Sequence, residues 1–434
     1  MRPSHGGARL DSDTTPTGAE PAAGGDVFRI PGFFAFWSAE TVSAFGSYVT
    51  TLAVHTTVVL LLGGTATDVG LVTMAGLLPN LLLGPVAGAL VDRYQRLRVL
   101  IVTDVASGLL LCLLPLLWIL GRLDIPVLMA LMFATNVSAI LNSAAAQSVL
   151  PRLVPRRHLL AANARIDQGA TVAQTSGSLV AGGLIALLGA PLAILADAVS
   201  CFVSAAAVAT VRLKESPQRP QGTLRTLHSE AGEALRWLYR HSLLGPLAIS
   251  THVWFFATGL VGTAMVAYTL RAEALGPFWL GFVYAAAGVA GLAGSLLAVP
   301  VGRWLGEGAT VIACRALASL AWVPVALLPD QPPWWLAVAL LAGTQALFGL
   351  SIGVENASEA SIWQRTIPDP LQARVVATRR SANRAMIVLG APAGGLIADS
   401  AGFGAAFWTG VAVFAVAVAV LVLVGFQKVR EEHG

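Results

Sequence analysis

The sequence predicts an all-α membrane protein with twelve transmembrane helices in two pseudo-symmetric six-helix bundles. Of its 434 residues, 56% are hydrophobic and only 12% are charged, whereas an ordinary soluble domain has about 25% charged residues. Apolar runs of about 20 residues, each long enough to cross the hydrocarbon core of a bilayer as a helix, recur from Phe33 almost to the C-terminus. One long charged segment near the middle of the chain divides these runs into two sets.

Each set contains six expected helices. We place their ends from the hydrophobic runs and from the Gly, Pro and charged residues that interrupt them. The first six are expected at 33–62, 67–91, 97–121, 126–150, 160–188 and 190–212, and the second six at 244–271, 276–303, 309–329, 333–363, 375–400 and 404–427. An N-terminal bundle over 28–213 and a C-terminal bundle over 244–427 follow from this division.

The polar segments are expected to lie outside the membrane. Residues 214–243 form a cytoplasmic linker, with an amphipathic surface helix around Leu224 to Tyr239. Residues 1–27 are rich in Gly, Pro, Ser and Thr and lack the apolar core of a signal peptide, so we expect a disordered cytoplasmic tail. Residues 428–434 form a second short tail.

Basic residues are concentrated on one side of the expected membrane protein, while the other side holds only Arg122 and Arg271. Loops that face the cytoplasm are enriched in Lys and Arg. This rule places the basic side and both termini in the cytoplasm, and the protein as a multi-pass protein in the inner or plasma membrane. The basic side carries Arg93, Arg96, Arg98, Arg152, Arg156, Arg157, Arg303, Arg365, Arg374, Lys428 and Arg430.

Other classes of protein are not favoured. The net charge of +4 comes from the basic loops, so no nucleic-acid partner is expected. Cys112, Cys201 and Cys314 lie far apart without metal-ligand spacing, so neither a disulfide framework nor a metal site is expected. The sequence has no nucleotide-binding glycine loop or nucleophile elbow. We therefore expect no enzyme and no cofactor.

The two halves are also similar in sequence when the fourth and fifth expected helices are laid over the tenth and eleventh, and the second over the eighth. Parallel six-helix repeats related by an axis along the membrane normal are the architecture of one large transporter class. The matches pair Asn142 with Asn356, Pro155 with Pro368, the run from Gly182 to Ile185 with that from Gly394 to Ile397, Gly70 with Gly281, Gly84 with Gly294, and Arg93 with Arg303.

The connection between the second and third helices, from Gly84 to Leu100, reads GPVAGALVDRYQRLRVL. It resembles the loop signature of the major facilitator superfamily. Gln95 stands where the pattern commonly has glycine. Two further stretches, FWSAETVSAFGSYVTTLAV near the start and AAAQSVLPRLVPRRHLLAANAR after the fourth helix, are similar to the branch with the enterobactin exporter, lysophospholipid transporters and macrolide-efflux proteins. The residues at the signature positions include Gly88, Asp92, Arg93 and Arg96.

The resemblance implies a secondary transporter, functional as a monomer among membrane lipids, which moves a hydrophobic or amphipathic small molecule such as a drug, antibiotic or siderophore. Its coupling ion would be the proton, and its direction export. Exporting members often have a Gly-Pro pair before the Gly-Gly of the fifth helix, where this chain has Ser178-Leu179. Import, including lysophospholipid flipping, therefore stays open, as does a non-transporting receptor or scaffold.

The signature loop is expected to act in gating. Asp92 can pair with an arginine or with a helix N-terminus of the other bundle, at an interface that must break in each cycle. Such a latch should be only marginally stable. The alternative is that Arg93, Arg96 and Arg98 hold the loop against anionic lipid.

Ionisable residues within membrane helices are costly there and usually mark a transport pathway. In the fold that the chain resembles, the first, fourth, seventh and tenth helices line the cavity, which favours Glu40, His252, Glu355 and Glu359 over Asp197. Glu355 and Glu359 share one helix face, so each should raise the proton affinity of the other unless Arg384 lies between them. The expected proton-coupling and transport residues are Glu40, Glu355, Glu359, His252 and Arg384.

Structural roles are the alternative for several of these residues. Glu359 can pair with Arg380 or Arg384 as a buried ion pair, and His252 can be a hydrogen-bonded packing residue. We expect His55 near the outer surface, and Asp104 as a partner of the loop arginines.

Overall fold

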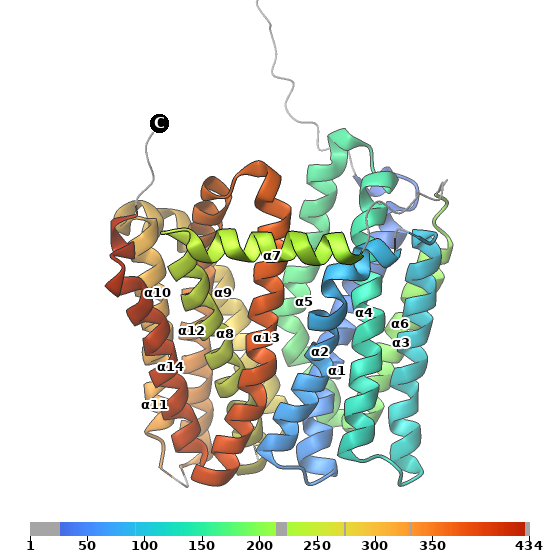
Figure 1. Cartoon of the computed structure of the whole chain (residues 1–434). Helices are drawn as coiled ribbons and strands as arrows, with labels where there is room; N and C mark the ends of the chain where they lie inside the picture. Colours follow the sequence, from blue (N-terminus) through green and yellow to red (C-terminus); the bar gives the residue numbers. More distant parts are fainter. Residues whose placement is uncertain (1–26, 92, 214–223, 273–274, 330–331, 430–434) are drawn as a thin grey trace, which may run out of the picture.

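The computed structural model describes residues 27–429, except 92, 214–223, 273–274 and 330–331. Nearly all of the two expected tails thus lies outside the described residues. Long helices stand side by side in two groups, and one further helix, α7, lies across one end of the molecule (Figure 1).

The helices agree in order and position with those expected from the sequence. Helix α13 begins earlier than expected, because Pro370 occupies its first turn, where proline is tolerated. The first group consists of α1 (Phe33–Thr56), α2 (Ala66–Val91), α3 (Arg96–Ile119), α4 (Ile125–Leu153), α5 (Leu159–Leu188) and α6 (Ala190–Ala209). The second consists of α8 (Leu244–Ala267), α9 (Pro277–Leu305), α10 (Glu307–Ala321) with its continuation α11 (Val323–Ala326), α12 (Trp334–Thr366), α13 (Asp369–Ala401) and α14 (Phe403–Leu423).

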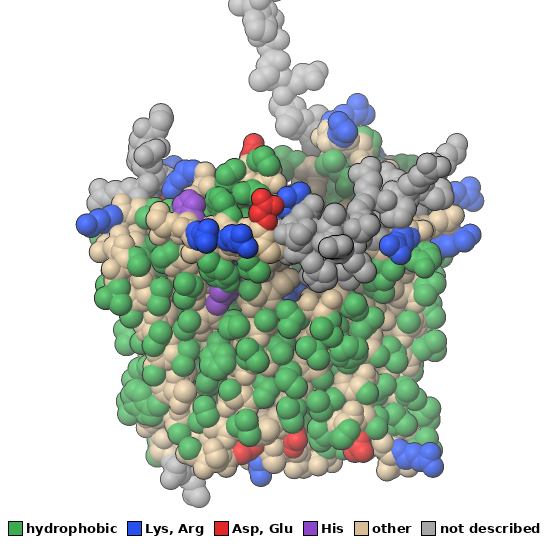
Figure 2. Space-filling model, in the orientation of Figure 1, with side chains coloured by type: hydrophobic (Ala, Val, Ile, Leu, Met, Phe, Trp, Pro, Cys, Tyr) green, Lys and Arg blue, Asp and Glu red, His purple; other side chains and the backbone are tan. Residues whose placement is uncertain are grey.

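Eleven of the described helical segments are long and apolar enough to cross a membrane. Helix α13 is the twelfth. Its mean hydropathy is lower than that of the others because Arg374, Arg379, Arg380 and Arg384 lie in its first half. It nevertheless packs along both α2 and α8, as a membrane-spanning helix of this bundle would. Hydrophobic side chains cover the flank of the molecule, while charged side chains gather at its two ends (Figure 2). With α13 included, the described helices agree with the expected number of twelve.

The expected surface helix is present as α7 (Leu224–Arg240). It packs against α13 and α8, and its buried residues Ala234 and Leu238 join a hydrophobic cluster with Leu244 and Leu247 of α8. We call the end of the molecule that carries α7 and the loop arginines the basic face, and the end that carries Arg122 and Arg271 the opposite face.

The two groups repeat one another in backbone detail. Helices α1 and α8 each have 24 residues, and each continues into a π-helical turn of five residues, Thr57–Leu61 and Tyr268–Ala272. Pro155 and Pro368 have nearly equal backbone angles, φ −55° and −59°, just before the helices that follow them. These equivalences support the six-helix repeat that the sequence predicted.

The two groups meet mainly through α2 with α13 and through α5 with α9. These contacts are closest near the opposite face, where a Cβ atom on Gly281 would run into the carbonyl oxygen of Ser178, and one on Gly70 into that of Ala391. Nearer the basic face, a Cβ atom built on Gly84 of α2 would lie 4.0 Å from Ser381 Oγ of α13. The space between the groups is therefore closed at the opposite face and wider at the basic face.

Candidate functional site

Two adjoining cavities lie between the helices. The larger, which we call the chamber, has a volume of about 840 Å³ and is lined by α1, α2 and α5 of the first group and by α8, α9, α12 and α13 of the second. The smaller, of about 560 Å³, is lined by α8, α12 and α13. Thr258, Ile352 and Asn356 line both.

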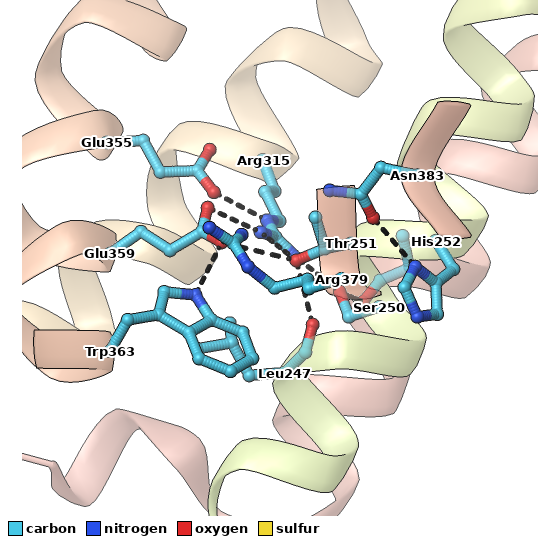
Figure 3. A network of polar contacts seen from close by, with 11 residues as sticks. Leu247, Ser250, Thr251, His252, Arg315, Glu355, Glu359, Trp363, Arg379 and Asn383 are labelled. Carbon is cyan, nitrogen blue, oxygen red and sulfur yellow. Dashed lines mark hydrogen bonds and ion pairs between the residues drawn. The ribbon is translucent and has the colours of Figure 1, made fainter. Parts of the chain in front are cut away.

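A buried arginine binds two glutamates that line the smaller cavity. Arg315 of α10 is 1% exposed, and its Nε donates to Glu355 Oε1 at 2.7 Å. Its Nη2 donates to Glu359 Oε2 at 3.2 Å and to Thr251 Oγ1 at 3.0 Å, and its Nη1 donates to Ser250 Oγ at 2.5 Å (Figure 3). One guanidinium thus joins α8, α10 and α12 and pairs with two carboxylates.

Glu359 has a second cationic partner. Its Oε1 accepts hydrogen bonds from Arg379 Nη1 at 3.2 Å and from Trp363 Nε1 at 2.9 Å. The Arg379 guanidinium also lies over the Trp363 ring, 4.5 Å from the ring centroid. Glu355, Glu359, Trp363 and Arg379 all line the smaller cavity. The two glutamates therefore share a wall, and both are bound to guanidinium groups.

The structure corrects the expected cationic partners. Arg384 does not lie between the two glutamates; its Nη1 bonds to Asn80 Oδ1 of α2 and so joins the two groups of helices. Glu359 pairs with Arg315 and Arg379, and neither Arg380 nor Arg384 bonds to it. Successive residues of a helix point about 100° apart, which is why Arg379 reaches Glu359 and its neighbour does not.

Sequence reasoning missed Arg315. It is the only charged residue of the expected helix 309–329, so the rule that singled out the buried glutamates would also have found it.

His252 forms a hydrogen-bonded link outside the glutamate cluster. Its Nδ1 lies 2.7 Å from Asn383 Oδ1 and its Nε2 lies 2.8 Å from the Tyr239 hydroxyl. Because an amide oxygen only accepts, Nδ1 carries the proton and Nε2 accepts from Tyr239. Partial burial raises the pKa of Tyr239, which keeps its hydroxyl protonated. These two hydrogen bonds link α7 to α8 and α13. They agree with the alternative that His252 is a hydrogen-bonded packing residue.

The acidic residues of the first group have neutral partners. Asp104 is buried and accepts from Asn142 Nδ2 at 2.7 Å and Ser204 Oγ at 2.6 Å, so the expected pairing with loop arginines is wrong. Asp197 accepts from Thr50 Oγ1 at 2.5 Å and from Ser200 Oγ at 2.9 Å. Glu40 is half-buried, and in the described part of the chain it lines neither cavity.

Helix α4 also differs from expectation. His55, in the last turn of α1 towards the opposite face as expected, lines the chamber, where its Nε2 lies 3.2 Å from Thr73 Oγ1. No described residue of α4 lines either cavity, although the resemblance implied that the fourth helix would. In this conformation α2, α5, α9 and α13 contribute in its place.

The signature loop is described only in part. Asp92 lies outside the described residues, so its role as a latch remains a prediction. Gly88 and Arg93 are exposed at the basic face, whereas Arg96 is 3% exposed.

Comparisons with known proteins agree with this architecture. Residues 36–378 match the family model of the Major Facilitator Superfamily. The chain is 30% identical over 356 residues to the multidrug efflux pump Tap of Mycolicibacterium fortuitum, which covers 79% of this chain and 84% of the relative. It is 23% identical over 248 residues to macrolide efflux protein A of Streptococcus pyogenes, covering 56% and 58%.

A solved structure has the same fold. The crystal structure of a bacterial homologue of the iron transporter ferroportin, in an inward-facing state, superimposes with a TM-score of 0.71 at 16% identity, covering 92% of this chain and 98% of that one. The match to the family model spans most of the twelve helices. The chain is thus a multi-pass membrane transporter and not an enzyme, and it belongs to the Major Facilitator Superfamily.

Proposed function

We propose that this protein exports a hydrophobic or amphipathic small molecule from the cytoplasm by alternating access, as a monomer in the cell membrane. Two relatives with efflux activity in their names support export. The chamber of about 840 Å³ is large enough for a drug-sized molecule. With the basic face in the cytoplasm, the contacts at the opposite face close the chamber to the outside.

We also propose the proton as the coupling ion and Glu355 as its carrier. The observation that carries this proposal is the ion pair between Glu355, 5% exposed, and Arg315 at the smaller cavity, which adjoins the chamber between the two bundles. A proton on Glu355 would remove its charge and weaken this pair. Arg315 would still be held by Glu359, Ser250 and Thr251. Protonation therefore changes the network without leaving a buried charge alone, which would be costly.

The test compares two variants in proteoliposomes with an imposed proton gradient. Glu355→Gln mimics the protonated form, so gradient-driven transport should be lost while substrate exchange, which needs no net proton release, continues. Glu359→Gln should keep more of the coupling and lose more stability, because Arg379 then lacks its carboxylate. The ratio of driven transport to exchange is measured for each. An unchanged ratio in Glu355→Gln would mean that another group, with Glu40 the next to test, carries the proton.

Import, including the flipping of lysophospholipids, is the second candidate, and the departure at Ser178-Leu179 is the observation in its favour. The same vesicles decide between the two when the protein's orientation is fixed. Uptake from the basic side indicates export, and uptake of a lysolipid from the opposite side indicates import. No movement of any compound in either direction would favour a receptor or scaffold.

A further inference from the structure

The wall of the chamber is almost free of charge. Among the described residues that line it there is no Asp, Glu, Lys or Arg, and His55 is the only histidine. During alternating access a substrate passes through a state from which water is excluded. A charged group in such a state needs a counter-charge, because an isolated buried ion is very costly. The chamber supplies none.

His55 has a buried ring nitrogen without a hydrogen-bond partner. The Thr73 hydroxyl donates its one proton to the carbonyl oxygen of Val69 at 2.8 Å. Thr73 Oγ1 can therefore only accept from His55 Nε2, 3.2 Å away, so the imidazole proton is on Nε2. Nδ1 is buried with no hydrogen-bond partner in the described part of the chain. A second proton there would make the ring a buried cation in a wall that has no described carboxylate, which would be costly, so Nδ1 keeps its lone pair.

Three other hydroxyls that line the chamber also donate their single proton to a backbone carbonyl oxygen. Thr175 Oγ1 donates to the carbonyl oxygen of Thr171 at 2.8 Å, Thr258 Oγ1 to that of Trp254 at 3.0 Å, and Ser295 Oγ to that of Leu292 at 2.7 Å. Since a hydroxyl has a single proton, each of these groups offers only lone pairs to a ligand. Together with His55 Nδ1, these hydroxyls give the chamber an acceptor surface, while the amide side chains of Gln174, Gln345 and Asn356 on the same wall can both donate and accept.

The apolar part of the wall is mainly aliphatic, with Val69, Val261, Leu292, Ile352 and Ile387, and it also includes Phe348 and Trp322, which pack edge to face with ring centroids 6.3 Å apart. An apolar frame would therefore lie against these side chains, with its polar groups towards the hydroxyls.

We propose that the chamber binds an uncharged amphipathic molecule whose hydroxyl or amide N–H groups donate hydrogen bonds to this wall. The proposal rests on the proposed transport function and narrows its substrate class. A cation is disfavoured because the nearby carboxylates of Glu355 and Glu359 are already bound to guanidinium groups. An anion would have to bind outside the chamber, at Arg380 of the smaller cavity.

The test uses four probes built on one naphthyl ether frame: 3-(1-naphthyloxy)-1,2-propanediol, its dimethyl ether, a trimethylammonium analogue and 1-naphthyloxyacetate. Equilibrium dialysis measures their binding to the full chain in nanodiscs. The diol should bind about tenfold more tightly than the dimethyl ether, since it makes one or two more hydrogen bonds, and more tightly than both ions. Equal binding of diol and dimethyl ether, absence of diol binding, or preference for the ammonium or carboxylate probe would overturn the proposal.

Matched variants locate the effect in the chamber. Thr175→Val and Thr258→Val keep the side-chain shape, and each should weaken diol binding about threefold while leaving the dimethyl ether unchanged. Thr409→Val is the control, because the Thr409 hydroxyl donates to Ala405 O at 2.7 Å on α14 and is not part of the chamber wall. Diol affinity that falls equally in the control, or in none of the variants, would contradict the proposal.

The binding measurements and the transport measurements test the two proposals independently. Donor-selective binding without gradient-driven transport would refute only the coupled transport. Driven transport with a preference for cations would refute only the substrate class.

Discussion

The carboxylate of Asp399, in the last turn of α13, caps the N-terminus of α2 at Thr67. Asp399 Oδ2 accepts from the Thr67 backbone N at 2.8 Å and from Thr67 Oγ1 at 2.6 Å, and Oδ1 accepts from the backbone N of Ala66 at 3.1 Å. A helix N-terminus has unpaired N–H groups and a partial positive charge. Because the two helices belong to different bundles, this cap holds the opposite face closed.

Asp399→Asn should therefore loosen the closed state. The substitution removes the negative charge at the helix N-terminus and one of the two accepting oxygens, a loss of about 1 kcal/mol, so the equilibrium should shift about fivefold towards opening at the opposite face. A cysteine at Thr263, which lines the chamber, should react faster with a membrane-impermeant thiol reagent added on that side. The background for this measurement lacks Cys112, Cys201 and Cys314.

Asp124→Asn is the matched control for this experiment. Asp124 Oδ1 accepts from the backbone N of Val127 at 2.8 Å and caps α4, but both residues belong to one bundle. The control should not change the reactivity at residue 263. Equal labelling of the two variants would mean that the Asp399 cap stabilises a helix and not the closed state.

The orientation of the chain gives a second prediction. The excess of Lys and Arg at the basic face places that face in the cytoplasm. A reporter fused after Lys428, and another within 214–243, should give cytoplasmic signals, while one near Gln331 should give an exterior signal. A reporter at 214–243 that is active only outside the cell would contradict both the orientation and the proposed direction of transport.

The fold was largely predictable because the bilayer imposes simple constraints. A helix that crosses it needs about 20 apolar residues, and all backbone groups must be bonded within the helix, so the hydrophobic runs located the twelve helices directly. Helix α13 has four arginines in its first half, and its start was therefore placed too late, at 375. The match of Pro368 and Gly394 to Pro155 and Gly182 is consistent with this helix.

The partners within the site were less predictable. Burial of Glu355 and Glu359 followed from their apolar surroundings, but the choice between Arg379 and Arg380 depends on the rotation of α13 about its own axis, which a sequence does not specify. The family resemblance implied which helices line the cavity, but it did not specify a conformation. In this structure α5, α9 and α13 also line the chamber, because which helices line it depends on which end of the molecule is closed.

The last prediction concerns the energetics of Arg315. Arg315→Met keeps the approximate length of the side chain but leaves Glu355 buried without a cation, whereas Glu359 retains Arg379 and Trp363. Removing one partner of a buried ion pair typically costs about 3–5 kcal/mol. The free energy of unfolding, measured by denaturant titration in one detergent, should fall by about this amount.

The double variant Arg315→Met/Glu355→Gln identifies the cause of that loss. If the unpaired carboxylate of Glu355 is responsible, its neutralisation should restore most of the stability, because a neutral amide costs far less to bury than an ion. Arg303→Met, which removes an exposed arginine, should have little effect on the unfolding free energy. Equal losses in the single and double variants would indicate that Arg315 stabilises the protein chiefly through Ser250, Thr251 and Glu359. The ion pair with Glu355 would then contribute little to stability.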